Sequence, residues 1–414
     1  MAATLAVPMI VGHGMSPAAA LFGAGAGTLI YVLFTKQRSP VFLGSSFAFL
    51  NSMAVAFAGG VSVALGFTGL ILGAIFAGLV YVTLSFVVKK FGTTWIRELM
   101  PSVVIGPTVA IIGLSLAGNA ISDLRTAPAG GSVYIAILCG LITLAVTMWC
   151  SVYGNKGLKL IPFIIGILAG YAVSAVFTLT TVPALQVINF APFKELNSIV
   201  ALPQFTFING VVGLKEINVS YILTILIAYA PVAFVVFAEH IADHKNLSTI
   251  IDRDLLADPG LDKTLLGDGV GSMVGAFFGG CPNTTYGESI GCGAITRNAS
   301  VVTIIATAIM AMVISFFSPF VAFLNTIPNC VMGGVCIALY GFIAVSGLKM
   351  IQFVDLDDNR NLFTVSVILI MGIGGFSLSF GSDINGNPII TLTEIACALI
   401  CGILTNRFLN REGK

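Results

Sequence analysis

This sequence has very few charged residues for its length. Only 9% of its 414 residues are Asp, Glu, Lys or Arg, whereas 57% are hydrophobic. The mean hydropathy is +1.02, and one water-soluble core cannot hide so much apolar surface. The composition therefore excludes an ordinary soluble domain and indicates a protein that lies in a bilayer.

Further absences exclude other functions. The net charge is +1, and no basic stripe or acidic tail points to nucleic acid as a partner. The eight cysteines form no metal pattern, because the closest pair, Cys397 and Cys401, has helical spacing rather than CxxC. We expect buried free thiols and no metal or other cofactor. The three histidines offer no nucleophile–base pair, so we expect no enzyme.

The first apolar stretch is short. "MAATLAVPMIVG" supplies about 12 residues before His13, whereas a span needs about 20. The stretch also lacks the basic start and cleavage site of a signal peptide. It is either a broken half-helix or the remainder of a longer span, and we expect the chain to be incomplete at its N-terminus.

Apolar runs of roughly 20 residues, the length that crosses a bilayer, recur along the whole chain. Counted with the short first segment, they predict an all-α polytopic membrane protein with fourteen transmembrane segments. The predicted helices after the first segment are 17–34, 48–62, 68–90, 97–118, 131–152, 160–179, 218–243, 264–280, 289–297, 299–318, 320–348, 361–379 and 388–406.

Basic residues give the orientation. If the spans alternate and the first runs outward, one side receives only Arg125, Lys194 and Lys215, and the other side receives all the remaining lysines and arginines. Cytoplasmic loops carry such an excess. The C-terminus is then cytoplasmic, the loop 180–217 is external, and the protein is expected in the cell membrane.

The sequence also contains a weak internal repeat. "MPSVVIGPTVAIIG" (Met100–Gly113) aligns with "IPNCVMGGVCIALY" (Ile327–Tyr340), so that Pro101 matches Pro328. These copies begin at the fifth and twelfth spans. Seven spans is an odd number, so the two halves would cross the membrane in opposite senses, as in transporters with inverted repeats. The repeats would cover residues 1–179 and 218–414.

Two hydrophobic runs are interrupted at corresponding places. "SPVFLGSSFAFLN" (Ser39–Asn51) falls in the third span, and "GGCPNTTYGESIG" (Gly279–Gly291) falls in the tenth. Their Phe, Thr and Tyr residues favour extended backbone. Irregular backbone at membrane depth is tolerated only where protein buries it or where it lines a cavity. We expect two short antiparallel strands that pair with each other and leave the following helix starts facing a ligand.

A cluster of ionisable residues lies in "FAEHIADH" (Phe237–His244). Glu239 and Asp243 are four residues apart and share one helical face. Glu239 follows an apolar run with no basic residue nearby, so we interpret it as a functional carboxylate. We expect Asp243 and His244 to be solvated at the cytoplasmic end. The spacing of His240 and His244 also fits a zinc site, but the glutamate of HExxH and a third ligand are missing.

Three more carboxylates occur within the apolar spans. We expect Asp268 and Glu394 to make polar contacts between helices. Glu288, in "TTYGES", either meets a polar ligand or accepts hydrogen bonds from Thr284 or Thr285 that hold the loop. Gly287 precedes it and would let backbone amides approach a ligand closely.

Five separated sequence blocks resemble, in order, those of the bacterial uracil permeases of the nucleobase–ascorbate transporter family. The blocks are "FLGSSFAF", "AEHI", "RDLLADPGL", "FFGGCPNTTYGESIG…AITR" and "IPNCVMGGV…LYG". The resemblance implies fourteen spans in two inverted repeats, with a core domain from segments 1–4 and 8–11 and a gate domain from segments 5–7 and 12–14. It also implies proton-coupled import of uracil or a related nucleobase, and it allows a homodimer through the gate domain.

The resemblance also implies the site residues. It makes Glu239 and Glu288 the carboxylates that bind the base, and it makes Phe47 and Gly287 the donors of backbone amides. The walls of the pocket would be Ala3, Tyr286 and Tyr340. Proton coupling would involve Glu239, with Asp243 and His240 as the next candidates.

The sequence departs from the family pattern at two informative places. In "ESIGCGAITR", Ser289 stands where the family signature usually has Asn. Because of this departure, a xanthine or urate carrier remains the alternative function. Within the family, however, glutamate at the first signature position, as Glu288 here, goes with uracil. Asp243 stands where some uracil permeases have histidine, which removes a histidine relay at that position.

Overall fold

The computed structural model describes residues 2–180, 182–194, 196, 198–382 and 388–410; for residues 2, 3, 97, 288, 381, 382 and 388–391 it describes the backbone only. Helices dominate this part of the chain. Seven stretches are long and apolar enough to cross a membrane: Pro17–Phe34, Val63–Phe91, Ser102–Leu124, Val133–Tyr153, Pro162–Leu179, Val219–Ile251 and Asn329–Ile351. Their number confirms a polytopic membrane protein.

Several helices begin where a polar side chain caps them. The Ser16 hydroxyl accepts a hydrogen bond from the Ala19 amide at the start of α2 (Pro17–Phe34). Ser62 caps α4 (Val63–Phe91) in the same way, and Asn218 caps α12 (Val219–Ile251). Each cap satisfies one of the amides that have no partner in the first turn. The long apolar runs thus start where the sequence supplies a cap.

One group of helices is built around α13 (Leu261–Gly279), which packs on both α2 and α4. The group also contains α1 (Ala2–Val11), α3 (Leu50–Ala56), α12, α14 (Gly287–Thr296) and α15 (Val301–Ile314). Glycines let α2 and α13 approach closely, since a Cβ added at Gly27 would lie 2.5 Å from the Gly271 carbonyl oxygen. Small residues commonly mediate such contacts in membranes.

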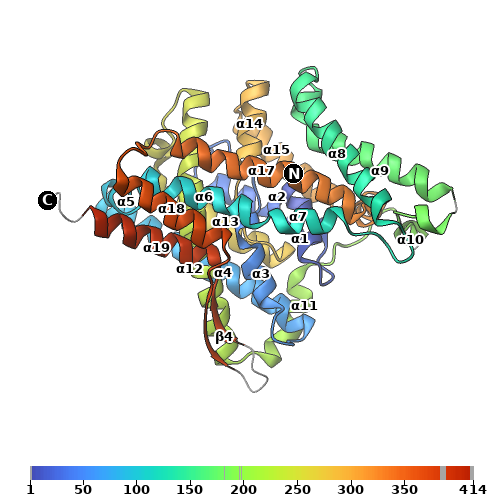
Figure 1. Cartoon of the computed structure of the whole chain (residues 1–414), viewed down its shortest axis with the longest axis horizontal. Helices are drawn as coiled ribbons and strands as arrows, with labels where there is room; N and C mark the ends of the chain where they lie inside the picture. The colour runs from blue at the N-terminus through green and yellow to red at the C-terminus, as the bar shows by residue number, and fades with distance from the viewer. Residues whose placement is uncertain (1, 181, 195, 197, 383–387, 411–414) are drawn as a thin grey trace.

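A second group is built around α17 (Asn329–Ile351), which packs on α6 (Ser102–Ser115), α7 (Ala117–Leu124) and α8 (Val133–Tyr153). The group continues with α9 (Pro162–Leu179), α18 (Asn359–Ile373) and α19 (Glu394–Leu409). Figure 1 shows α8 and α9 at one end of the long axis, and α18 and α19 near the C-terminus at the other end.

The two interrupted segments pair as expected. β1 (Leu43–Ser45) and β2 (Asn283–Thr285) form an antiparallel two-stranded sheet in which Gly44 lies opposite Thr284. All six residues are buried. Their backbone hydrogen bonds are therefore satisfied between segments some 240 residues apart in sequence, which confirms the predicted pairing.

Two predicted helices are each divided at a proline. The predicted helix 97–118 separates into α5 (Thr94–Leu99) and α6, with Pro101 between them. The predicted helix 320–348 separates into α16 (Ser318–Thr326) and α17, with Pro328 directly before α17. The cause is local, because proline lacks an amide hydrogen and disfavours helical backbone in the residue before it.

The end of the chain differs most from the prediction. The predicted helix 361–379 ends at Ile373, and the predicted helix 388–406 begins with a strand. β3 (Leu378–Ser382) and β4 (Pro388–Leu392) form an antiparallel hairpin, which projects at the bottom of Figure 1. The apolar run in β4 is rich in β-branched residues, and such a short run does not distinguish a strand from a helix by its period.

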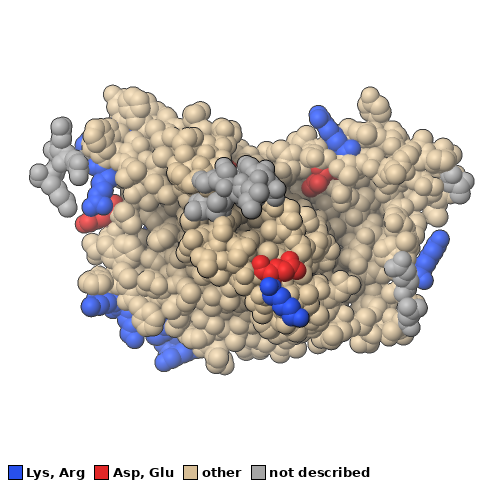
Figure 2. Space-filling model, turned by 90° about the horizontal axis from the view of Figure 1, so that it is seen from below, with Lys and Arg blue, Asp and Glu red and all other residues tan. Residues whose placement is uncertain are grey.

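The loop 180–217 also contains two short helices, α10 (Ala191–Lys194) and α11 (Thr206–Gly213). α11 packs on α4, where the Thr68 hydroxyl donates a hydrogen bond of 2.7 Å to the Gly210 carbonyl. On the face shown in Figure 2, most of the surface carries no charge, and the lysines and arginines lie mainly along the margins. An uncharged surface of this kind suits contact with lipid.

Candidate functional site

The β1–β2 sheet places two helix starts symmetrically. Two residues after β1, Phe47 begins the 3-10 turn η1 (Phe47–Phe49); two residues after β2, Gly287 begins α14. The first amides of a helix have no partner within it. The structure therefore brings Phe47 and Gly287, both predicted amide donors, to equivalent ends of one small sheet.

Tyr286 ties this sheet to α1. Its hydroxyl donates a hydrogen bond of 2.9 Å to the Ser45 carbonyl and lies 3.0 Å from the Thr4 hydroxyl. A Cβ at Gly44 would overlap the Tyr286 ring, so glycine is needed for the ring to lie against β1. Tyr286 is thus a buried wall, as predicted, while the side chain of Ala3 lies outside the described part of the chain.

Phe47 and Tyr340 meet across the two helix groups. Their ring centroids are 5.2 Å apart with an interplanar angle of 89°, an edge-to-face contact. Both side chains are buried. The predicted wall residue on α17 therefore contacts the predicted amide donor that follows β1.

The acidic face of α12 points at the start of α14. Asp243 accepts a hydrogen bond of 2.7 Å from the Thr285 hydroxyl. A Cβ at Gly287 would lie 3.7 Å from the other Asp243 oxygen. Asp243 is therefore partly buried and bonded at the β2–α14 junction, and our expectation that it is solvated is wrong.

Glu239 lies one turn earlier on this helix. It is also partly buried, but no hydrogen bond joins its carboxylate to any residue whose side chain the structure describes. The Glu288 side chain lies outside the part of the chain whose side chains the structure describes. Of the two threonines considered for it, Thr285 is engaged with Asp243.

The two histidines of α12 are fully buried. The His240 Nδ1 atom lies 2.7 Å from an Asp268 carboxylate oxygen, which confirms Asp268 as a contact between helices. The His244 Nε2 atom lies 2.7 Å from the Tyr31 hydroxyl. The expectation that His244 is solvated beside Lys245 is wrong, because α12 continues to Ile251 and its packed region extends past the predicted end at residue 243.

Glu394 joins the two helix groups. One of its carboxylate oxygens accepts a hydrogen bond from the Asn51 side-chain amide, so α19 is connected to α3. The predicted contact between helices is confirmed. Asn51 was not singled out from the sequence, although it lies in the interrupted third segment.

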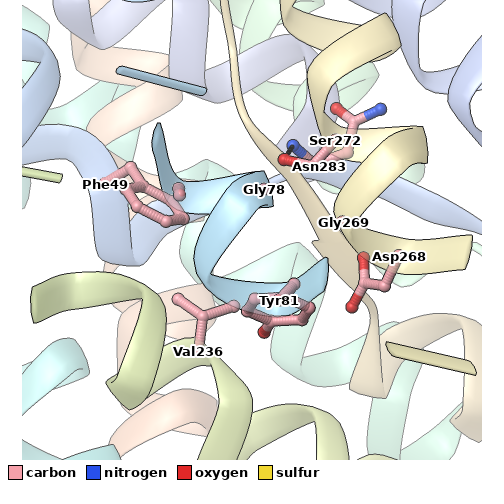
Figure 3. Close-up of a pocket in the computed structure, with 9 residues that line it drawn as sticks. Phe49, Gly78, Tyr81, Val236, Asp268, Gly269, Ser272 and Asn283 are labelled. Carbon is pink, nitrogen blue, oxygen red and sulfur yellow. Dashed lines mark hydrogen bonds between the residues drawn. The ribbon is translucent and has the colours of Figure 1, made fainter. Parts of the chain in front are cut away.

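Two cavities adjoin these elements. A cavity of about 10 Å³ lies between α4, α12 and α13, lined by residues that include Phe49, Tyr81 and Asp268 (Figure 3). A surface cavity of about 540 Å³ lies beside residues 192–204 and is lined by none of the predicted site residues. Within the described residues, no three His, Cys, Asp or Glu side chains are grouped for a metal ion.

Known proteins match this chain over most of its length. Residues 1–379 match a model described as a permease family. The chain belongs to this permease family. Its members are transporters, so the protein is not an enzyme. The uracil permease of Bacillus caldolyticus is 37% identical over 410 residues, covering 98% of this chain and 88% of the relative. The uracil permease of Escherichia coli K12 is 37% identical over 408 residues, covering 97% and 89%.

Solved structures of other transporters share the fold of this permease. The transmembrane domain of the cyanobacterial bicarbonate transporter BicA matches with a TM-score of 0.60 at 16% identity, covering 98% of this chain and 94% of that one. Murine Slc26a9, an anion transporter in the inward-facing state, matches with a TM-score of 0.64 at 11% identity, covering 98% and 65%. At these identities the similarity concerns the fold alone.

Proposed function

We propose that this permease imports uracil, driven by the proton gradient. Uracil permeases at 37% identity over nearly the full chain support the substrate. The observation that carries the proposal is the β1–β2 sheet, because it brings the two amide donors and the acidic face of α12 to one place.

The architecture that we propose has fourteen spans in two inverted repeats of seven. Three features support it. β1 and β2 precede their helices by the same number of residues, and Pro101 and Pro328 directly precede α6 and α17. α6 and α17 also pack against each other, as two symmetry-related elements would. The group around α13 would be the moving core domain, and the group around α17 would be the gate domain.

Uracil has two N–H donors and two carbonyl acceptors. In the proposed site, Glu239 and Glu288 accept the N–H groups, while the amides of Phe47 and Gly287 donate to the carbonyls. Hydrogen bonds to an ionised acceptor are about twice as strong as neutral ones, so two carboxylates would favour a base with two N–H groups. Tyr286, Tyr340 and Ala3 would enclose it.

Proton coupling is assigned to Glu239. An isolated carboxylate is costly within a membrane, and Glu239 lacks a hydrogen-bond partner among the described side chains, whereas Asp243 accepts one from Thr285. Protonation would remove the charge of Glu239 as the core domain moves. Asp243 and His240 remain the next candidates for this role.

Uptake of labelled uracil in permease-deficient cells tests the proposal. Expression should produce accumulation that a protonophore abolishes and that excess unlabelled uracil competes away. Xanthine should compete weakly. Strong competition by xanthine would favour the purine carrier considered as the alternative, and uptake that unlabelled uracil does not reduce would indicate a channel.

We further propose residence in the cell membrane with a cytoplasmic C-terminus, supported by the unequal division of basic residues. A homodimer through the gate domain is the assembly that fits the proposed architecture. Its exposed apolar residues include Trp149 and Tyr153 on α8, which lipid or a second copy would cover. The molar mass of purified protein in detergent would test the dimer.

A further inference from the structure

The surface cavity of about 540 Å³ contains none of the residues proposed for transport. Its volume falls within the roughly 300–1,000 Å³ that is usual for sites that bind small molecules. Three segments line it: the turn between α1 and α2, residues 192–204 of the long loop, and residues 315–325, which include most of α16. The distribution of basic residues places all three on the external side. The cavity is therefore on the side from which the proposed importer would receive its substrate.

Backbone hydrogen bonds hold two walls of this cavity together. The Ala201 amide donates to the Phe316 carbonyl over 3.0 Å, and the Ser318 amide donates to the Ile199 carbonyl over 2.9 Å. These bonds pair the loop in antiparallel fashion with the residues at the start of α16. The cavity is thus formed by segments that lie far apart in sequence and are fixed to each other.

Two side-chain carboxamides line the cavity, Gln204 on the loop and Asn325 on α16. Both side chains are exposed, and neither forms a hydrogen bond with a residue that the structure describes. Each offers a carbonyl acceptor beside an NH₂ donor. The other described lining residues are apolar or carry a hydroxyl group, and none is Asp, Glu, Lys, Arg or His. The cavity therefore suits an uncharged molecule that has an N–H group beside a carbonyl group.

The residue after each carboxamide is anchored to a neighbouring helix. On the loop, the ring of Phe205 packs edge-to-face against Phe22 of α2, with ring centroids 5.0 Å apart. On α16, the Thr326 hydroxyl lies 2.9 Å from the Tyr171 hydroxyl of α9. The backbone beside each carboxamide is therefore held in place, which reduces the cost of ordering the two side chains around a ligand.

We propose that this cavity is a second, external binding site for uracil, separate from the transport site. The proposal rests on the proposed uracil import. Each N–H group of uracil lies beside a carbonyl group, so a carboxamide makes two parallel hydrogen bonds with that edge of the ring. Asn and Gln recognise adenine by the same kind of paired contact. Leu202 and Val321 supply apolar contacts for the ring.

The external site should bind uracil more weakly than the transport site. Its carboxamides are neutral, whereas the proposed transport site has two carboxylates, and hydrogen bonds to ionised groups are about twice as strong. Uracil therefore fills the external site only at concentrations that already saturate the transport site.

Protection of a cysteine in the cavity tests the proposal. In a Cys292→Ser background, Leu202→Cys places a thiol at an exposed position of the cavity wall. We expect excess uracil to at least halve the rate at which this thiol reacts with a membrane-impermeant maleimide. Lys215→Cys, outside the cavity on the same proposed side, is the matched control and should react equally fast with and without uracil.

Two further variants show where the protecting uracil binds. Glu288→Gln is expected to lose binding at the transport site, and we expect uracil to protect Leu202→Cys in it as well. The double variant Gln204→Ala/Asn325→Ala should lose the protection but still import uracil. Both of its substitutions are at exposed positions, where changes usually leave stability unaltered.

The outcomes separate the two claims. If the protein neither binds nor imports uracil, the proposed function fails and the external site fails with it. If the protein imports uracil but Leu202→Cys is not protected, only the external site is refuted. Protection that disappears in Glu288→Gln would also refute it, because the thiol would then report a change caused by the transport site. Protection that persists in Gln204→Ala/Asn325→Ala would refute it as well.

Discussion

At the scale of single residues, Glu239 and Asp243 differ although one helical turn separates them. Asp243 accepts a hydrogen bond from Thr285, a contact that stabilises its ionised form. Glu239 has no such partner among the described side chains. This difference is why we propose Glu239, and not Asp243, as the group that changes its protonation during transport.

Glu239→Gln imitates a permanently protonated Glu239. We expect the variant to exchange uracil across the membrane but to lose accumulation driven by the proton gradient, because its charge can no longer change. Gradient-driven uptake and counterflow in proteoliposomes would be compared. A variant that still concentrates uracil in response to an acid exterior would exclude Glu239 as the coupling group.

Glu288→Gln replaces an ionised acceptor with a neutral amide. Since charge-assisted hydrogen bonds are about twice as strong as neutral ones, we expect uracil binding to be severely weakened or abolished. Calorimetry on purified protein measures it, with Ser289→Ala as a neighbouring control that keeps the charge. Wild-type affinity in Glu288→Gln would show that this carboxylate does not bind the base.

Asp258 lies outside the apolar helices and forms exposed ion pairs with Arg38 and Arg253. Hydrogen bonds from the guanidinium groups of Arg38 and Arg253 lower the pKa of Asp258 below its usual 3.8. A lowered folded-state pKa contributes stability that is present above the ordinary value and is lost as pH falls through the lowered one.

We expect Asp258→Asn to reduce the melting temperature slightly at pH 7, since exposed ion pairs contribute little. The difference from wild type should begin to shrink as the pH falls below about 3.8, should vanish only below the lowered pKa of Asp258, and should also shrink in high salt. Melting curves at several pH values and salt concentrations would measure it. An unchanged difference at acid pH would show that the charge of Asp258 is not responsible.

At the scale of elements, the site depends on how closely α2 and α13 approach. A Cβ at Gly27 would lie 2.5 Å from the Gly271 carbonyl oxygen and 2.7 Å from the Asn283 side-chain nitrogen. Asn283 belongs to β2. The packing of these two helices therefore also determines where the β1–β2 sheet lies.

Gly27→Ala should destabilise the protein by about 1–3 kcal/mol, the usual cost of overpacking. Gly341→Ala on α17 is the control, because a Cβ there meets nothing within 4 Å. Thermal unfolding in detergent measures both, and we expect uracil to stabilise Gly27→Ala less than wild type. Equal stability of the two variants would refute the claim of close packing.

Helix boundaries show what local sequence can predict. α2 and the central parts of α4, α8 and α9 were predicted because their apolar runs are long and their ends carry caps or breakers. The hairpin β3–β4 was missed, since an apolar run of five residues fits either a strand or a buried helix. The helices are interrupted at Pro101 and Pro328 by the prolines themselves. Each interruption was missed because the apolar residues continue on both sides of the proline.

At the scale of the whole molecule, the distribution of basic residues gives a testable orientation. In a Cys292→Ser background, which removes an exposed natural thiol, Lys156→Cys should react with a membrane-impermeant reagent only from the cytoplasmic side. Lys215→Cys should react only from outside. Intact cells and inverted vesicles distinguish the two, and reversed labelling would overturn the proposed orientation.

The sequence by itself determined that the protein lies in a membrane, that it crosses it several times, and that the two interrupted segments pair as strands. It also singled out Glu239 and Gly287, because composition, apolar run length and interrupted helices are local properties, whereas Phe47 and Tyr340 were named only through the resemblance to a family. The resemblance to a family supplied their roles.

Only the tertiary structure decided which groups meet. The bond between Asn51 and Glu394, the Thr285–Asp243 contact and the burial of His244 against Tyr31 join segments that lie far apart in the chain. No periodicity encodes such partners, since they depend on how helices cross. The same is true of the contact between His240 and Asp268, which exists only after α12 and α13 have packed.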